Sequence, residues 1–218
     1  TNLLELAGDL SWEARLSSGR SAFFRQNHAE AESLLTAVVN ATNAPLGQVA
    51  RAEFYLGDVA AEQTARNPTN LVEAINHYER VALEMTNSPL NAAAWGRLGD
   101  CRLQLGEFVQ ATAAYQTVTE LPGADVTTRS QAKLGLARVL AGQADTEGET
   151  DLSERFLQQA LDHCLEIVFG GNLRSANEKM DPFWVKEAGL MAGRLAKQLG
   201  QAEQERKLYT RLAEELPM

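Results

Sequence analysis

The sequence predicts an all-α protein, an α-solenoid of about five antiparallel helix pairs. The first reason is composition: Ala and Leu are its commonest residues, Ile occurs only at 75 and 167, and aromatic residues make up 6%. Ala and Leu are favoured in helices, whereas strands draw on β-branched and aromatic residues. The second reason is an internal repeat of glycine, alanine and aromatic positions. Because stacked pairs share one continuous core, we expect residues 1–218 to form a single helical-repeat domain.

The clearest copy of the repeat spans residues 92–123. In chain order it carries Trp95, Leu98, Gly99, Gly106, Phe108, Ala111, Tyr115 and Pro122. This order resembles the tetratricopeptide repeat, a helix–turn–helix unit of about 34 residues with aromatic, small and turn residues at set positions. The resemblance covers nearly the whole copy.

Spacing extends the pattern along the chain. Gly99 precedes Ala111 by twelve residues, and Tyr115 follows Ala111 by four. Two other copies keep both intervals and two lengthen the first: Gly19–Ala31–Leu35, Gly193–Glu205–Tyr209, Gly57–Ala74–Tyr78 and Gly135–Ala160–Cys164. The predicted repeats are therefore approximately 12–45, 50–89, 92–123, 128–170 and 182–217.

A second glycine follows the first by seven residues in three copies, as Gly106, Gly142 and Gly200. We expect it to lie within a helix, and the earlier copies hold Gln26 and Thr64 in its place. Small residues such as Gly99 let paired helices approach closely. The bulky Trp95 and Tyr115 are expected to fill the space between neighbouring pairs.

Helix boundaries and charged positions give further expectations. Asp181-Pro182 supplies a cap and a first-turn proline for the last pair, and Gly170-Gly171 ends the preceding helix. Arg102 and Arg138 stand at equivalent places where the family usually has an aromatic residue. An arginine there needs a carboxylate partner or a route to solvent.

Three segments interrupt the repeats. Residues 64–70 break the second pair, with Asn67-Pro68 as a turn signal. Residues 143–151 are expected to form a solvated acidic loop. They lack the spacing of a calcium loop, because Thr150 stands where glycine is needed. Residues 171–181 are expected to link the last two repeats.

No residue pattern predicts catalysis or a cofactor. Cys101 and Cys164 lie in helical patterns and are expected to be buried free thiols. The histidines at 28, 77 and 163 are scattered and show no metal-ligand spacing. His163 and Cys164 are adjacent, and adjacent side chains on a helix do not face each other, which argues against a catalytic dyad. We therefore expect no enzyme activity, no cofactor and no bound metal.

Charge and hydropathy exclude some partners. The formal net charge is −9 and the pI is about 4.9, which argues against binding to a nucleic acid backbone. No apolar run is long enough to span a bilayer, so direct membrane insertion is not expected. Because the chain begins at Thr1 without an initiator Met, we expect a fragment of a longer or processed chain. The compartment, cytoplasmic or bacterial envelope and periplasm, is left open.

The resemblance implies a protein-interaction scaffold. Tetratricopeptide arrays curve into a right-handed superhelix whose first helices line a concave groove that receives a peptide or a partner protein. Phe23 and Phe24 cannot both point into one core: either one is an exposed anchor, or the N-terminal segment covers both. The candidate partner-binding face comprises Arg20, Phe23, Phe24, Arg51, Asp58, Glu62, Asp100, Leu103 and Gln104.

Other classes of function remain open. Some members of the family grip terminal carboxylates with Lys and Asn on successive first helices. That clamp pattern is absent here, because the comparable positions hold Arg20, Asp58, Asp100, Leu136 and Arg194. The irregular spacing is similar in style to bacterial tetratricopeptide proteins that coordinate envelope assembly. The alternatives are self-association, which makes a homo-oligomer, and a regulatory segment of a larger multidomain protein or enzyme.

Overall fold

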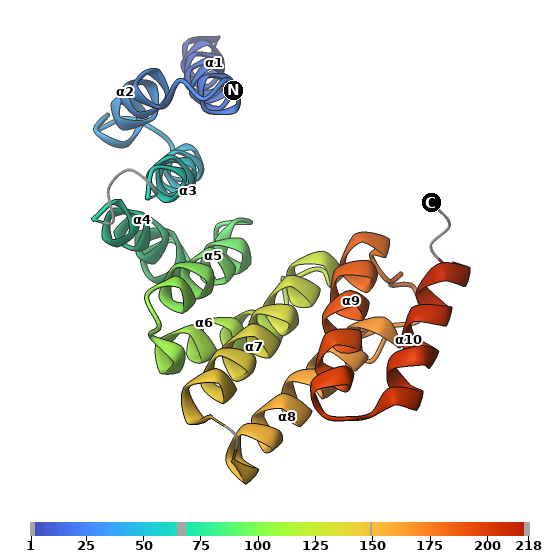
Figure 1. Cartoon of the computed structure of the whole chain (residues 1–218). Helices are drawn as coiled ribbons and strands as arrows, with labels where there is room; N and C mark the ends of the chain where they lie inside the picture. The colour runs from blue at the N-terminus through green and yellow to red at the C-terminus, as the bar shows by residue number, and fades with distance from the viewer. Residues whose placement is uncertain (1–2, 65–68, 149, 216–218) are drawn as a thin grey trace. The chain divides into compact units, whose positions relative to one another are not determined.

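The computed structural model describes residues 3–64, 69–148 and 150–215, and within them the side chains of residues 3–10 and 215 are left aside. These ranges contain ten α-helices and one π-helical turn, and no strand. The helices pack as sequential pairs, mostly with their neighbours in the chain (Figure 1). Their bounds are α1 (Leu3–Phe24), α2 (His28–Val39), α3 (Leu46–Glu62), α4 (Asn70–Glu79), η1 (Arg80–Glu84), α5 (Asn91–Gln104), α6 (Phe108–Glu120), α7 (Val126–Glu147), α8 (Asp151–Val168), α9 (Pro182–Gln198) and α10 (Ala202–Glu215).

Each predicted repeat contains one pair of helices, so the all-α class and the succession of pairs are confirmed. The chain divides into two compact units, Thr1–Cys101 and Arg102–Met218. The first holds α1 to α4, η1 and most of α5, and the second holds α6 to α10. The single-domain organisation and the superhelix stay predictions.

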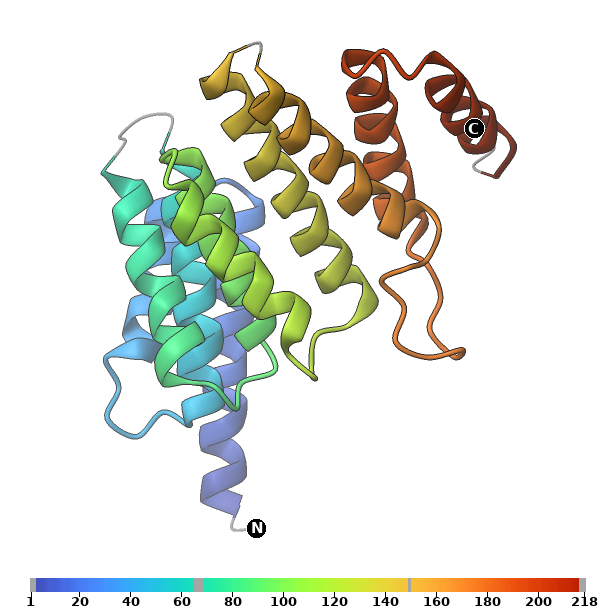
Figure 2. The same ribbon diagram turned by 90° about the horizontal axis from the view of Figure 1, so that it is seen from below.

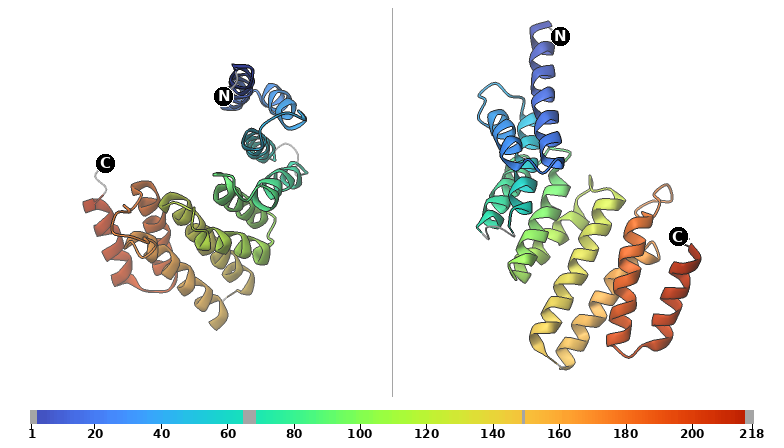
Figure 3. Two further views of the ribbon diagram at one scale, coloured as in Figure 1. Left: turned by 180° about the vertical axis from the view of Figure 1, so that it is seen from behind. Right: turned by 45° about the horizontal axis from the view of Figure 1, so that its top comes forward.

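In the first unit, α1 packs on α2 and α3, and α3 packs on α4. Helix α1 runs without a break from Leu3 to Phe24, and its N-terminal turns extend past the other helices of this unit (Figure 3). The N-terminal segment therefore does not fold back over Phe24. The core of the unit joins Leu16, Ala22, Phe23, Ala31, Leu35, Val38, Ala52, Leu56 and Val59.

The glycines of the repeat mark close approaches between helices. A β-carbon on Gly57 would lie 2.5 Å from Cε1 of Tyr78, and one on Gly193 would lie 2.5 Å from Cζ of Tyr209. Likewise, a β-carbon on Gly19 would lie 2.9 Å from Cδ2 of Leu35. In each contact the glycine and its partner are the first and last positions of one copy of the repeat. The close approach at the glycine is expected, and the bulky residue packs within its own pair.

The fourth copy uses its glycine differently. Gly135 on α7 lies against the ring of Tyr115 on α6, the second helix of the preceding pair. Tyr115 is fully buried, so it fills the space between neighbouring pairs as expected. Small residues also allow close helix packing in the core of the second unit, where α7 to α10 lie side by side (Figure 2). Five of its twelve buried members are Ala137, Ala160, Ala188, Ala192 and Ala196.

The expectation that the second glycine of the pattern lies within a helix is wrong for two of its three copies. Gly106 and Gly200 do not lie within helices but in the turns after α5 and α9, with φ of +73° and +70°. Gln26 holds the same place after α1 with φ of +60°, and it is the one described non-glycine residue with a positive φ. Gly142 alone stays inside a helix, where Phe108 packs against it.

The expectation of an acidic loop over residues 143–151 is also wrong. Helix α7 continues to Glu147, so Asp145 and Glu147 lie on a helix and not in a loop over 143–151. The buried Ala144 fixes this extension, and its carbonyl accepts a hydrogen bond of 3.2 Å from Ser153 Oγ of α8. Thr150 and Asp151 begin the next helix, as its cap and first residue.

Other boundaries agree with the sequence. Asp181 caps α9 by accepting from the Phe183 amide, and Pro182 is the first residue of that helix. Helix α8 ends at Val168, ahead of Gly170 at φ +73°. Residues 171–181 form the expected irregular link. The turn predicted at Asn67-Pro68 lies outside the described residues.

Two arginines hold that link, one against the start of α7 and the other against the end of α6. Arg129 is 3% exposed and donates to the carbonyls of Ala124 and Asn172 and to Glu178, with Nη2–Oε2 at 2.6 Å. Arg174 donates to the carbonyl of Thr119 in the last turn of α6 and to those of Leu121 and Pro122, which follow that helix. A cation at a helix C-terminus is favoured by the helix dipole, so Arg174 closes α6 and anchors the link together.

Candidate functional site

The two adjacent phenylalanines of α1 have different environments. Phe23 is 9% exposed and belongs to the core of the first unit, whereas Phe24 is 68% exposed. Their ring centroids lie 5.4 Å apart. Of the two expectations, an exposed Phe24 is correct, and its role as an anchor stays a prediction. Exposed aromatic side chains are the type that dominates binding energy at interfaces.

Phe24 belongs to a small cluster with a cation. Arg20 places its Cζ 5.6 Å from the Phe24 ring centroid and 5.8 Å from that of Tyr55 on α3. Both distances lie within the range of a cation–π interaction, which holds the guanidinium between the two rings. We call Arg20, Phe24 and Tyr55 the Arg20 cluster. Tyr55 was not predicted, because its contact joins two helices.

Arg51 is engaged within the unit. Its Nη1 lies 2.5 Å from Glu13 Oε2 and its Nη2 3.0 Å from Glu13 Oε1, a two-point pair between α3 and α1. The hydrogen bonds from Arg51 lower the pKa of Glu13. Arg51 therefore contributes to the packing of α1 on α3, and its position on the predicted face supports the surface around the Arg20 cluster.

Asp58 is engaged in the same way. It accepts 2.7 Å from the Tyr78 hydroxyl on α4 and lies 3.3 Å from Arg97 Nε on α5. The side chain of Asp58 is 13% exposed, and burial raises its pKa. Burial and the Asp58 carboxylate likewise raise the pKa of Tyr78. Arg97 also lies 3.9 Å from Asp100, so three helices of the unit meet through these charges.

The remaining predicted residues are not members of the Arg20 cluster. Glu62 is half exposed at the end of α3, with its Oε2 3.9 Å from His28 Nε2. Leu103 is half-buried and Gln104 is exposed in the last turn of α5, which belongs to the second unit. Arg102, the neighbouring arginine at an aromatic position, donates to Glu107 at 2.6 Å, and Arg138 is exposed. Arg102 thus has the expected carboxylate partner, and Arg138 has the expected route to solvent.

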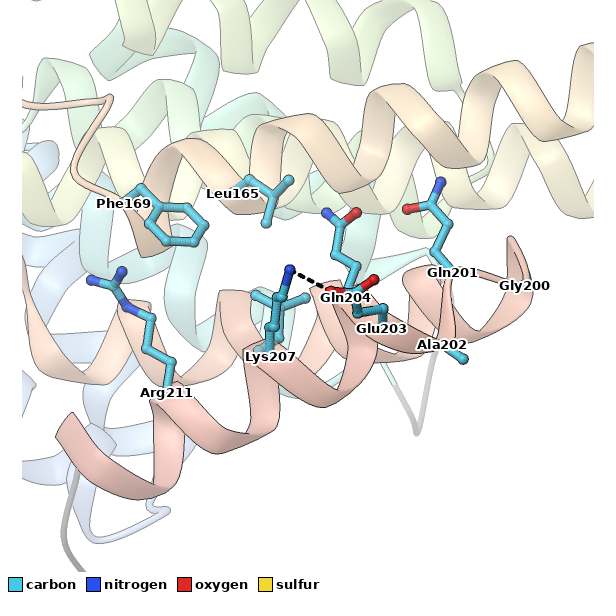
Figure 4. A pocket seen from close by; sticks show the side chains of 10 residues that line it. Leu165, Phe169, Gly200, Gln201, Ala202, Glu203, Gln204, Lys207 and Arg211 are labelled. Atoms are coloured by element: carbon cyan, nitrogen blue, oxygen red, sulfur yellow. Dashed lines mark ion pairs between the residues drawn. The ribbon is translucent and has the colours of Figure 1, made fainter.

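The second unit contains a groove of about 850 Å³ between α8 and α10 (Figure 4). Leu165 and the buried Leu208 supply an apolar floor, and Phe169 stands at one end with 57% of its surface exposed. At the opposite end, Gln201 Nε2 donates to Gln158 Oε1 of α8 at 2.8 Å. We call this the α8–α10 groove. It is lined by Leu165, Phe169, Gly200, Gln201, Ala202, Glu203, Gln204, Lys207, Leu208 and Arg211.

Charged side chains of α10 form the rim of this groove. Arg211 places its Cζ 4.4 Å from the Phe169 ring centroid, and Lys207 Nζ lies 2.7 Å from Glu203 Oε1 (Figure 4). The hydrogen bond from Lys207 lowers the pKa of the exposed Glu203. Lys207 and Arg211 also line an adjoining hollow of about 330 Å³ that includes Arg206.

A second depression of about 500 Å³ lies between α6, α7 and α8 and contains no carboxylate or permanent cation. His163 lines it. Burial is the main cause that lowers the pKa of His163, and the charge of nearby Lys133 lowers it further. Burial raises the pKa of Cys164 to about 12, so its reactive thiolate is scarce at neutral pH. Both cysteines are buried and neither forms a disulfide, as predicted.

The groove was not predicted, because its walls lie on helices distant in the sequence. A signal was nevertheless present: Lys207 and Arg211 stand one helical turn apart and share a face of α10. Over the described ranges, no three His, Cys, Asp or Glu side chains gather in a metal-binding group.

Comparison of the chain with models of protein families and with curated proteins finds no match in either. The fold class therefore rests on the helices alone: the protein is all-helical, with ten described helices packed as sequential pairs. Nowhere in the described residues does a helix combine the length and apolarity that crossing a bilayer requires.

Proposed function

We propose that this chain is a tetratricopeptide-like scaffold that binds a partner polypeptide and does not catalyse a reaction. The observation that carries the proposal is the shared register of its helix pairs. A glycine of the first helix faces a bulky side chain of the second in the pairs Gly19–Leu35, Gly57–Tyr78 and Gly193–Tyr209. Repeated pairs of this kind are the building units of helical solenoids, which present extended binding surfaces.

The connections between the helices support the same proposal. Gln26, Gly106 and Gly200 follow the first helices of three pairs at one register, each with a positive φ. One turn geometry thus recurs in both units. A left-handed residue closes many helices, so the support comes from its recurrence at the same register in three pairs.

The binding face that we propose is the first-helix face around the Arg20 cluster. Phe24 offers a large exposed ring, and Arg20, which also lies over Tyr55, packs on it. A ring that is already positioned loses little conformational entropy when a partner covers it. Beneath that surface, Arg51 pairs with Glu13 of α1. Asp58 binds Tyr78 of α4 and Arg97 of α5, so these contacts keep the neighbouring helices in place.

Quantitative affinity capture from an extract of the source organism tests this proposal. We expect Phe24→Ala to lose at least one partner that the wild type captures, because truncating an interface anchor costs about 2 kcal/mol or more. Val72→Ala is the matched control, since Val72 is an exposed apolar residue on a second helix of the same unit. Equal capture by the folded Phe24→Ala protein contradicts the first-helix face.

Self-association through the same exposed ring is the alternative outcome. Light scattering over a range of concentrations separates the two cases, because a homo-oligomer gains mass with concentration and a monomeric scaffold does not. A mass increase that Phe24→Ala abolishes assigns the ring to a second copy of the chain.

A further inference from the structure

We propose that the α8–α10 groove binds a peptide segment in which an acidic side chain lies next to a large apolar one. This goes beyond the scaffold function proposed above, because the groove is formed by second helices and contains none of the first-helix candidates. It gives the second unit a ligand of its own, with a stated chemistry.

The apolar half of the ligand follows from the floor of the groove. Leu165 and Leu208 line a space of about 850 Å³, and Phe169 keeps more than half of its surface exposed beside them. This volume lies in the range of sites that enclose a ligand, and burial of the exposed Phe169 ring and the half-buried Leu165 favours an apolar side chain.

The acidic half follows from α10. Lys207 and Arg211 line the groove one helical turn apart, and Arg206 lines the adjoining hollow. With Glu203 in the groove and Glu214 in the hollow, cations outnumber carboxylates by three to two on this part of a protein with a net charge of −9. A local positive surface on an acidic protein attracts carboxylates and repels basic segments. The apolar floor and the cations line the same groove. An apolar side chain of the ligand can therefore lie on the floor while the neighbouring acidic side chain meets Lys207 or Arg211.

The two cations at the groove are held in different ways. Arg211 is positioned over the Phe169 ring, so a carboxylate meets a guanidinium whose freedom is already reduced. Lys207 is paired with Glu203, and the two side chains are 70% and 72% exposed. Such an exposed pair is weak, so an incoming carboxylate can replace Glu203. Glu203 is therefore a built-in competitor of the ligand.

The experiment begins with a library of random peptides displayed on phage, selected on the complete chain. We expect the selected peptides to combine Asp or Glu with an adjacent Phe, Leu or Trp. One such peptide is then synthesised with a fluorescent label, together with a form in which Asn or Gln replaces each acidic residue. Fluorescence polarisation should show that the neutral form binds about tenfold more weakly.

Three variants and a control test the assignment of residues. Arg211→Gln and Lys207→Gln should each weaken the acidic peptide by about tenfold. Glu203→Gln should tighten its binding by roughly threefold, because the competing carboxylate is gone. Lys186→Gln removes a charge from an exposed site on α9 outside the groove and should leave the affinity unchanged.

Several outcomes overturn the proposal. They are the selection of peptides without acidic residues, the absence of any enriched peptide, and an affinity that Glu203→Gln lowers or leaves unchanged. Phe24→Ala separates this inference from the scaffold proposal, because it should leave the acidic peptide bound. Loss of the acidic peptide in that variant contradicts an independent groove and leaves the first-helix proposal standing.

Discussion

Gly57 of α3 lies directly against the ring of Tyr78 of α4, so that a β-carbon on Gly57 would meet Tyr78 Cε1 at 2.5 Å. The hydroxyl of the same tyrosine donates to Asp58, the next residue along α3. A glycine, a buried ring and a buried carboxylate thus fix the spacing and the rotation of one helix on the other.

Gly57→Ala should destabilise the protein by about 1 to 3 kcal/mol, because the added methyl group forces the buried Tyr78 ring to shift. Urea denaturation followed by circular dichroism measures the change. Gly47→Ala on the same helix is the control, since a β-carbon there meets nothing within 4 Å. That variant should be neutral or stabilised by up to about 1 kcal/mol. Equal losses from both substitutions contradict the close approach.

Gln26→Gly should stabilise the protein by about 1 kcal/mol. The φ of +60° at Gln26 is strained for a residue with a β-carbon and is unstrained for glycine. The mirror substitution Gly200→Gln, at φ +70°, should destabilise by a similar amount. Thermal unfolding of the two variants and the wild type measures both. Destabilisation by Gln26→Gly, or no loss from Gly200→Gln, shows that the two turns do not share a geometry.

Arg129→Met should destabilise by about 2 to 4 kcal/mol, because the buried carbonyls of Ala124 and Asn172 lose their donor and the Glu178 carboxylate, which keeps its bond from the Arg174 amide, loses its cation. Hydrogen exchange should also quicken across residues 171–181, which this side chain holds. Arg155→Met, at an exposed site on α8, should change stability by less than about 0.5 kcal/mol. Unchanged exchange in the link shows that other contacts hold it.

The acid stability of the protein should depend on Glu53. This carboxylate is 2% exposed, with Oε2 2.6 Å from His77 Nδ1 and Oε1 2.8 Å from Arg80 Nη1. Burial by itself raises the pKa of Glu53, but the hydrogen bonds from His77 and Arg80 outweigh burial and hold the pKa below its ordinary value of 4.5. The unfolded chain therefore binds the proton more tightly, and this contribution to stability is lost as pH falls below that value.

Glu53→Gln should therefore cost stability at neutral pH, and the difference from the wild type should shrink as the pH falls below 4.5. Urea midpoints across this range measure the trend. Glu32→Gln, an exposed site on α2, serves as the control and should follow the wild type throughout. A constant difference between Glu53→Gln and the wild type at all pH values contradicts the linkage.

The sequence predicts the pairs because their contacts recur at short, fixed spacings. Gly19 and Leu35 are sixteen residues apart, as are Gly193 and Tyr209, and each pair meets in the structure. Helix ends are less readable. Gly106 and Gly200 resemble helix positions by interval alone, and only the backbone shows that they are left-handed turn residues. Asp145 stays helical because burial of the neighbouring Ala144 outweighs the loop-like composition of its segment.

The candidate site is less predictable, because it depends on contacts between distant residues. Arg51 and Glu13 are 38 positions apart, and no spacing rule pairs them. The exposure of Phe24 was one of two expectations, and the choice between them depends on the direction that α1 takes before Trp12. Phe169 and Arg211 come from different repeats, so the groove that they share exists only once α8 and α10 are packed.

The central claim is that a partner polypeptide lies on the first-helix face. The most direct test incorporates the photoreactive p-benzoylphenylalanine in place of Phe24 in one protein and in place of Val72 in another, followed by irradiation in an extract of the source organism. The account predicts a crosslinked polypeptide at position 24 and none at position 72. Crosslinks at position 72 alone, or the same crosslinks at both positions, would contradict it.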